Sequence, residues 1–249
     1  MRLSYERMTW QEAGEASGRL AILPLGATEQ HGPHLPLSVD TVLAGGVAGA
    51  LAEALGAVLL PALPYGEAAT SEGHPGTLSL TADTMARVIA DIGRGVHRIG
   101  HPALILLNGH FGNRAPAAQA AEMLAAEGIA VLCLDYPGLE DLAGAICESE
   151  AAGNHFYHAD EVETSMMLAL APEVVRMERA VAEYPDFPAD FGSRPMLLRE
   201  LSESGTFGDP RPSTAEKGRA LIDGIVAAAL LEVAAFCEAH GIEAGAWQR

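Results

Sequence analysis

The sequence predicts an α/β fold, a three-layer α/β/α arrangement around a mostly parallel central sheet. Short apolar runs alternate with longer segments of helical length, and polar residues repeatedly follow the apolar runs. In parallel sheets such polar segments lie at the carboxyl ends of the strands, where ligands bind. The 249 residues are 49% hydrophobic and 19% charged, which is enough for a sizeable core. We therefore expect one domain spanning residues 1–249.

Each element follows from its local pattern. Four apolar runs predict strands, at residues 20–25, 57–63, 103–107 and 129–134. Ala- and Leu-rich segments closed by glycine or carrying capping residues predict five helices, at residues 41–55, 81–99, 115–127, about 160–171, and 213–240. The last helix is expected to open on a capping box of Ser213 and Glu216. Residues 135–158 are expected to be less regular, and residues 177–212 to form loops or an excursion that packs on a neighbour.

Composition narrows the classes of partner. The net charge of -18 repels phosphate backbones and anionic lipid headgroups, so we expect neither nucleic acid nor a membrane surface as a partner. No apolar run approaches the ~20 residues of a membrane span, and the start of the chain lacks the apolar segment of a signal peptide. Three cysteines without paired spacing suggest free thiols in a reducing compartment, and we expect the protein in the cytoplasm.

Polar residues gather in the segment 26–40, directly after the first predicted strand. Glu29 and His31 are two positions apart, so their side chains project to the same side if the chain is extended there. Asp40 closes the segment and can return to the same point. Two carboxylates and an imidazole on a loop at the end of a strand are suitable ligands for a divalent metal. The alternative is a solvated loop, which is the better interpretation of any one of these residues alone.

Two later segments repeat this pattern. His110 follows a run of Leu, Ile and Ala in a tight glycine turn, which would expose it above the sheet; a packed core histidine is the alternative. His158, Glu161 and Glu163 lie at the entry to a predicted helix, where the two glutamates repel each other unless a cation or solvent intervenes. Alone, these acids would be interpreted as a helix start favoured by the macrodipole.

Together these segments resemble the creatininase family, the creatinine amidohydrolase-like metal hydrolases. The similar motifs occur in family order and cover nearly the whole chain. They are Thr28 to Leu37 (TEQHGPHLPL) with Asp40, Pro75-Gly-Thr77, Asn108-Gly-His110 with Asn113, His158 with Glu163-Thr-Ser165, and Gly208-Asp-Pro210 with Thr214-Ala-Glu-Lys-Gly218. The resemblance implies a creatininase-like α/β fold and a pair of divalent metals bridged by one carboxylate, with zinc and manganese the first choices and iron another.

The resemblance also implies a ligand set. Glu29, Asp40 and His110 would hold one metal, and His31 with Asp40 the other, so that Asp40 is the bridge. In creatininase proper the last ligand is a glutamate in the turn where this chain has Gly112. We expect Glu161 to take that role, as in relatives with glycine in the turn, and Glu163 is the second choice.

The activity implied is hydrolysis of a C–N amide bond by a metal-activated water. His158 would protonate the departing nitrogen, with Glu163 holding or assisting it. Four side chains are expected to face the substrate, Tyr65, Ser71, His74 and Phe111, and a simple surface histidine is the alternative for His74. Creatininase proper closes its pocket with tryptophans before the position of His158, and this chain has none between Trp10 and Trp247. Creatinine itself is therefore not expected to be the substrate.

Three alternatives stay open. The chain could hydrolyse a lactone or a C–C bond in a cyclic polyol ketone at the same dinuclear site. It could bind metal or a small ligand without turnover, or its polar loops could only solvate the end of the sheet. The resemblance implies a small-molecule amide substrate, which includes formamides and peptide-like amides, and a homo-oligomer, which in the family is a hexamer.

Overall fold

A parallel five-stranded sheet forms the centre of the molecule. The computed structural model describes residues 3–153, 156–191 and 196–243. The strands are β1 (Leu3–Ser4), β2 (Ala21–Leu25), β3 (Val58–Leu59), β4 (Ala103–Asn108) and β5 (Ala130–Leu134). Their order is β1-β3-β2-β4-β5, and every neighbouring pair is parallel. The long pairing of β2 with β4, from Ala21 opposite Leu104 to Leu25 opposite Asn108, aligns the ends of these two strands.

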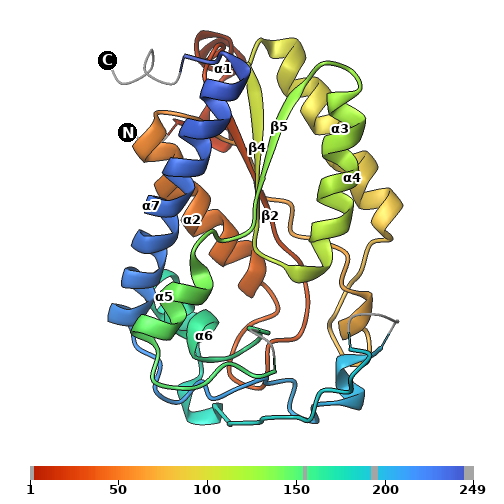
Figure 1. The fold of residues 1–249 in the computed structure, drawn as a ribbon, viewed down its shortest axis with the longest axis vertical. Coiled ribbons are helices and arrows are strands. Elements are labelled where there is room, and N and C mark those ends of the chain that lie inside the picture. Colours follow the sequence, from red (N-terminus) through yellow and green to blue (C-terminus); the bar gives the residue numbers. More distant parts are fainter. Residues whose placement is uncertain (1–2, 154–155, 192–195, 244–249) are drawn as a thin grey trace.

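Helices cover both faces of this sheet (Figure 1). One face carries α2 (Val39–Leu55), α5 (Leu139–Ile146), α6 (Glu161–Leu170) and α7 (Ala215–His240), and the other carries α3 (Ala82–Ile99) and α4 (Arg114–Ala125). A short helix, α1 (Trp10–Glu15), precedes β2. Two separate apolar cores lie against the two faces, one containing Leu43 and Ile225 and the other Ile89 and Leu124. The predicted three-layer α/β/α arrangement is confirmed.

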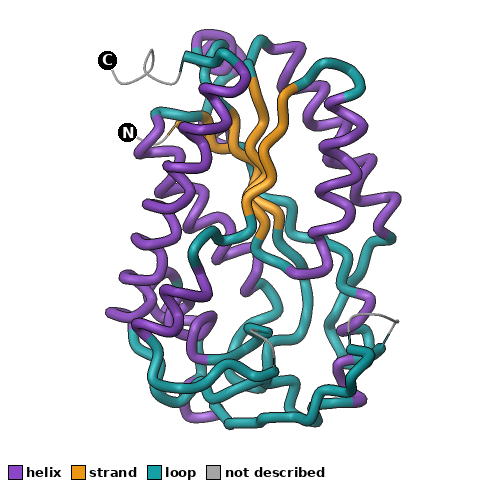
Figure 2. The backbone as a smooth tube through the Cα atoms, viewed as in Figure 1, coloured by secondary structure: helices purple, strands orange, loops and turns teal. Residues whose placement is uncertain are grey.

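The connections place the switch point of the sheet at the carboxyl ends of β2 and β4. From β2 the chain enters α2 on one face of the sheet, and from β4 it enters α4 on the opposite face. Adjacent strands whose connections leave in opposite directions define the switch point at which open α/β sheets bind ligands. The long connecting segments gather beyond this end of the sheet (Figure 2).

Two predicted element boundaries were wrong, and both matter for the site. Helix α2 begins at Val39, so Asp40 lies in its first turn and not on the preceding loop. A carboxylate is favoured there by the positive end of the helix dipole. Helix α7 is capped by Thr214, whose side chain accepts a hydrogen bond from the Lys217 backbone N–H, and the hydroxyl of Ser213 donates instead to the Glu161 carbonyl.

Other differences are local. Of the predicted strand 57–63 only Val58–Leu59 joins the sheet ladder, and β1, α1 and α5 were not predicted. Within 177–191 and 196–212, the described part of the predicted loop region, no α-helix or strand occurs, as predicted. Short 3₁₀ turns lie at Tyr5–Arg7, Ala69–Ser71, Phe111–Asn113, Pro172–Val174, Met177–Arg179 and Leu198–Glu200.

Helix α7 is long and apolar enough to cross a membrane when judged by length and composition alone. Core helices of globular proteins meet the same two criteria. Here α7 packs against α2, α5 and α6, with Leu221, Ile225 and Val233 fully buried. Packing in the core of this face explains part of its apolar character, since 33% of its most apolar window is buried.

Candidate metal centre

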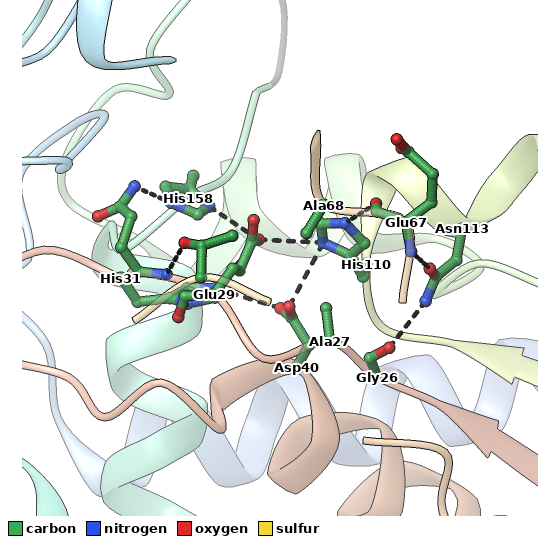
Figure 3. A network of polar contacts seen from close by, with 12 residues as sticks. Gly26, Ala27, Glu29, His31, Asp40, Glu67, Ala68, His110, Asn113 and His158 are labelled. Carbon is green, nitrogen blue, oxygen red and sulfur yellow. Dashed lines mark hydrogen bonds and ion pairs between the residues drawn. The ribbon is translucent and has the colours of Figure 1, made fainter. Parts of the chain in front are cut away.

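Five ionisable side chains from four segments meet at the carboxyl ends of β2 and β4. Figure 3 shows Glu29, His31, Asp40 and His110 of this group, with His158 beside them. We call this group the carboxylate–histidine cluster; its members are Glu29, His31, Asp40, His110 and Glu163. Glu29 and His31 come from the loop after β2, Asp40 from α2, His110 from the turn after β4, and Glu163 from the first turn of α6. Glu29, His31 and Asp40 are each at most 2% exposed to solvent.

Asp40 joins the two halves of the cluster. Its Oδ2 atom lies 3.3 Å from Nδ1 of His110, and its Oδ1 atom lies 3.1 Å from Nε2 of His31. Glu29 Oε1 completes the first half at 3.0 Å from His110 Nδ1, and Glu163 Oε2 completes the second at 3.6 Å from His31 Nε2. A carboxylate with one oxygen in each of two adjacent groups is the arrangement of a bridging ligand in a dinuclear site.

The two histidines of the cluster are oriented by backbone carbonyls behind them. Nε2 of His110 donates to the carbonyl of Glu67 at 2.7 Å, and Nδ1 of His31 donates to the carbonyl of Glu29 at 3.2 Å. Because a carbonyl oxygen only accepts, each ring must carry hydrogen on its outer nitrogen. The inner nitrogen then faces the carboxylates, with its lone pair available to a cation, as is usual for metal-ligating histidines.

The centre of the cluster holds polar atoms that the protein leaves unsatisfied. Glu29 Oε2, His31 Nε2 and Asp40 Oδ2 are buried and form no well-aligned hydrogen bond with any described residue. Burying such atoms without partners costs free energy, so their presence calls for a ligand. Oxygen and imidazole nitrogen donors of this kind suit Zn²⁺, Mn²⁺ and Fe²⁺. The donor set therefore fits a pair of divalent ions.

Charge in the cluster shifts the pKa values of its histidines. Burial opposes the protonation of His31, but the charges of Asp40, Glu163 and Glu29 outweigh it and raise the pKa to about 10. The pKa of His110 is raised well above its ordinary value against the same cost of burial. Without a metal, protons on these rings balance the buried carboxylates, and a metal would have to displace them.

Two asparagines brace the loops around the cluster. The amide of Asn108 donates to the carbonyl of His110 at 2.7 Å and accepts from its backbone N–H at 3.1 Å, which fixes the turn after β4. Asn113 accepts from the backbone of Glu67 at 3.0 Å and donates to the carbonyl of Gly26 at 3.0 Å. The loops after β2, β3 and β4 are thereby tied to one another.

His158 lies at the edge of the cluster. Its Nδ1 is 3.8 Å from Glu29 Oε1, and its ring lies 4.4 Å from that of His31, centroid to centroid. Burial and the nearby charge of His31 lower its pKa to about 4. Glu29 lies between His158 and His110 (Figure 3).

Glu161, expected to be the last metal ligand, points elsewhere. Its carboxylate pairs with Lys217 Nζ at 2.5 Å and accepts the backbone N–H groups of Ser149 at 2.7 Å and Glu148 at 3.0 Å. Glu161 is only 1% exposed, so these partners stabilise a buried charge. Glu163, the second choice, lies in the cluster instead. The expectation that Glu161 joins these donors is therefore not met by its position, and the ligand set proposed below uses Glu163.

The four expected substrate-facing residues differ in their surroundings. Tyr65 and Phe111 are about half exposed, at 49% and 59%, and are available to a ligand. Ser71 is fully buried, and neither its hydroxyl nor the ring nitrogens of the partly buried His74 have hydrogen-bond partners among the described residues. Ser71 therefore does not reach the surface at which a substrate would arrive.

Two features of the site were missed in the sequence. Gln30, between two members of the cluster, is buried and its side-chain amide contacts Nε2 of His158 at 2.8 Å. Phe156 stacks on His158 at 6.0 Å and lies 6.4 Å from Phe111, which extends an aromatic surface from the cluster to solvent. Gln30 could have been suspected, because its neighbours on both sides are candidate ligands.

Comparison with known proteins identifies the family. A sequence profile of the creatininase family, creatinine amidohydrolase, matches residues 6–233. The chain is 31% identical to the creatinine amidohydrolase of Pseudomonas putida, over 87% of this chain and 90% of that protein. It is 34% identical to the mycofactocin precursor peptide peptidase of Mycolicibacterium smegmatis, over 80% of this chain and 78% of that one.

Another relative is the 3-dehydro-scyllo-inosose hydrolase of Thermotoga maritima, which is 30% identical over 73% of this chain and 60% of its own length. Among solved structures, a creatininase mutant of the Zn–Zn type superposes with a TM-score of 0.83, at 28% identity and covering 94% of this chain and 97% of that one. A manganese creatininase superposes with a TM-score of 0.79, at 29% identity and covering 94% and 98%.

The fold and the buried donor set are those of a metal-dependent α/β hydrolase. The chain belongs to the creatininase family. The relatives above are named for three different reactions. Family membership therefore establishes the class of protein, and the substrate has to be inferred from the site.

Proposed function

We propose that this protein is a dinuclear metal-dependent amidohydrolase that cleaves a C–N amide bond in a small molecule or a peptide-like substrate. The observation that carries the proposal is the orientation of the cluster. Two histidines are turned by backbone carbonyls so that their inner nitrogens face carboxylates with unsatisfied oxygens. Such an arrangement is typical of metal sites and is not expected of a loop whose polar side chains are only hydrated.

The proposed ligand set assigns each half of the cluster to one ion. Glu29, Asp40 and His110 would hold the first, and His31, Asp40 and Glu163 the second, with Asp40 shared. Zinc and manganese are the first candidates, since homologous creatininase structures are of a Zn–Zn and a Mn type, and iron suits the same donors. When bound, such ions supply Lewis acidity to a carbonyl and lower the pKa of coordinated water.

The residues of the chain would orient the substrate and handle protons around this centre. His158 faces the cluster through Nδ1, the atom that would donate a hydrogen bond to the departing nitrogen. The proton that this nitrogen gains would come from the attacking water. Glu163 contacts the second half of the cluster and also accepts the backbone N–H of Ala159, next to His158, at 2.6 Å. It thereby fixes the segment that carries His158 in addition to its proposed role as a ligand.

The aromatic surface formed by Phe111 and Phe156 favours a substrate with an apolar group beside the scissile bond. Apolar rings next to a charged centre also exclude water from the reaction. Relatives of this chain include a creatinine amidohydrolase and a precursor peptide peptidase, so an amide is the preferred bond. The inosose hydrolase relative keeps a cyclic polyol ketone as the second candidate substrate. We further propose a cytoplasmic homo-oligomer.

Metal analysis followed by a substrate panel tests this function. Purified protein should contain two divalent ions per chain, and the Zn- or Mn-loaded form should hydrolyse a member of a panel of formamides, small lactams and short peptides. The His158→Ala variant should keep both ions and lose about 10²- to 10³-fold in turnover, the contribution of a positioned hydrogen-bond donor. Turnover of lactones or the polyol ketone alone, or no rate above that of the free metal, would refute the amidohydrolase.

A further inference from the structure

Three histidines converge on the cluster, but they are not oriented in the same way. Behind His31 and His110 lies a backbone carbonyl, which accepts a hydrogen from the outer nitrogen of each ring. Behind His158 lies the side-chain amide nitrogen of Gln30, 2.8 Å from Nε2. An amide nitrogen donates and does not accept. Nε2 of His158 must therefore accept a hydrogen bond, so the single hydrogen of the neutral ring lies on Nδ1.

The orientation of the Gln30 amide is fixed by two backbone groups. Its oxygen accepts the backbone N–H of Gly32 at 2.9 Å, and its nitrogen donates to the carbonyl of Gly205 at 3.2 Å. Turning the amide over would place its oxygen against that carbonyl and its nitrogen against that N–H group. Both contacts would then be repulsive. The side chain is only 6% exposed, so water does not offer an easy substitute.

The segment behind Gln30 is itself held in place. Gly205 adopts a left-handed conformation, with φ of +79°, and a Cβ atom added there would lie 1.9 Å from the amide oxygen of Gln30. Its backbone N–H donates to Ser202 Oγ at 2.9 Å, and Ser202 Oγ donates in turn to Glu183 at 2.8 Å. Glycine is thus required for the close approach, and Glu183 anchors the segment from outside.

We propose that Gln30 is a positioning residue that holds His158 in the neutral tautomer with its hydrogen on Nδ1. That atom faces Glu29 Oε1 at 3.8 Å, on the side of the cluster. The ring also packs against those of His31 and Phe156, with centroids 4.4 and 6.0 Å away. His158 is then a hydrogen-bond donor to the reacting amide and not a third histidine ligand, although its nitrogen lies within ligand distance of Glu29 and His31.

The group behind each histidine ring distinguishes a metal-ligating histidine from one that donates a hydrogen bond. A carbonyl behind a ring leaves the inner lone pair to a cation, whereas an amide donor behind it leaves an inner N–H to a substrate. The tautomer is independent of the reaction catalysed. Only the effect of the tautomer on turnover rests on the proposed amidohydrolase function. An experiment can therefore disprove the tautomer without disproving that function, and the reverse.

Nitrogen NMR of the zinc-loaded protein tests the tautomer directly. Protein labelled with ¹⁵N-histidine should show one histidine, identified by its loss in His158→Gln, with a protonated Nδ1 and an unprotonated Nε2. Gln30→Glu presents oxygen acceptors to Nε2 and should move the hydrogen to that atom. Gln30→Met presents neither donor nor acceptor and should abolish the single fixed pattern.

Metal content and kinetics complete the test. Both Gln30 variants should keep two ions per chain, because Gln30 contributes no atom to the cluster. On the best substrate of the panel they should lose about 10- to 100-fold in kcat with little change in KM, as for residues that orient a functional group. Gly205→Ala should reproduce the Gln30→Met spectrum by displacing the amide from the other side.

Three results would overturn the proposal: a hydrogen on Nε2 of His158 in the wild-type protein, a zinc-bound His158, or an unchanged Nδ1–H pattern in Gln30→Glu. The wild-type spectrum decides the question even if a variant fails to fold. It also decides it if no substrate is turned over, since the spectrum requires only the zinc-loaded protein.

Discussion

Two glutamates in the first turn of α6 have opposite surroundings. Glu161 is buried against Lys217 and two backbone N–H groups, so both oxygens of its carboxylate have partners. Glu163, two residues later, points into the carboxylate–histidine cluster, where Oε2 lies 3.6 Å from His31. The two side chains have the same chemistry and nearly the same place in the sequence. One belongs to a satisfied ion pair and the other to the group of candidate metal donors.

Their pKa values express the same difference. For Glu161 the cost of burial is outweighed by the contacts from Lys217, Ser149 and Glu148, and the pKa falls below its ordinary value. For Glu163 burial dominates, Asp40 and Asp160 add repulsion, and the pKa rises to about 8. A buried acid with full partners stabilises the fold, whereas a buried acid held at a cost indicates a site for a ligand.

Removing the shared carboxylate should have the largest effect. We expect Asp40→Asn to lose both ions, since each half of the cluster depends on this side chain. Lewis acidity of bound metal contributes several kcal/mol to such reactions, so turnover should fall by at least about 10³-fold. Elemental analysis and a kinetic assay on the best substrate check this. Retention of two ions would contradict the bridging role.

The matched pair Glu163→Gln and Glu161→Gln should separate the two regions. Glu163→Gln should bind fewer than two ions and lose about 100-fold or more in turnover. Its metal-free form should be at least as stable as wild type, because folding no longer has to protonate this side chain at neutral pH. Glu161→Gln should keep both ions and its turnover. Its free energy of unfolding should drop by about 1–3 kcal/mol, the cost of leaving buried partners unmatched.

Elemental analysis of each purified variant measures the number of bound ions. Urea unfolding of the same samples with a chelator present measures the free energy of unfolding. The comparison between the two regions would be wrong if Glu161→Gln released metal, or if Glu163→Gln changed only stability.

The sequence is sufficient to predict that most of the carboxylate–histidine cluster comes together. Glu29, His31 and His110 each follow a strand that is visible as an apolar run, and parallel strands place their carboxyl ends at one edge of the sheet. Their convergence with Asp40 follows from topology alone. The structure brings the four side chains together as predicted, and their role as metal ligands stays a prediction.

The choice between Glu161 and Glu163 could not be made in the same way. Successive residues of a helix turn by about 100°, so two residues apart the side chains project in nearly opposite directions. Which one faces the cluster depends on the rotation of α6 about its axis. That rotation is set by the packing of α6 against α7 and α2, with Val162 and Met166 buried, and by Lys217 from a distant part of the chain.

The tautomer of His158 lay beyond the sequence for a similar reason. Its partner Gln30 is 128 positions away and is oriented by Gly205, which no local pattern connects to either residue. Contacts of this kind arise only when loops from different strands pack together. The same limit explains why Ser71, expected to face the substrate, is buried instead.

The smallest expected effect is a pH dependence of stability confined to the cluster. In the metal-free protein the pKa of His31 is about 10, against an ordinary value of 6.5, so folding favours its protonated form. This stabilisation is complete below pH 6.5 and is lost as the pH rises toward 10; His110 acts in the same direction. Glu161 does not add to the change in stability between pH 6.5 and 10. Because its pKa is lowered, the stability that it contributes is lost only at acidic pH.

We therefore expect the free energy of unfolding of chelator-treated protein to fall between pH 6.5 and 10 by an amount on the order of 1–3 kcal/mol. Metal-loaded protein should change less, because the ions replace the protons that balance the carboxylates. Glu161→Gln should keep the wild-type slope at a lower overall stability. Asp40→Asn should flatten it, since His31 and His110 lose their common counter-charge. An equal slope in all three proteins would place the titrating groups outside the cluster.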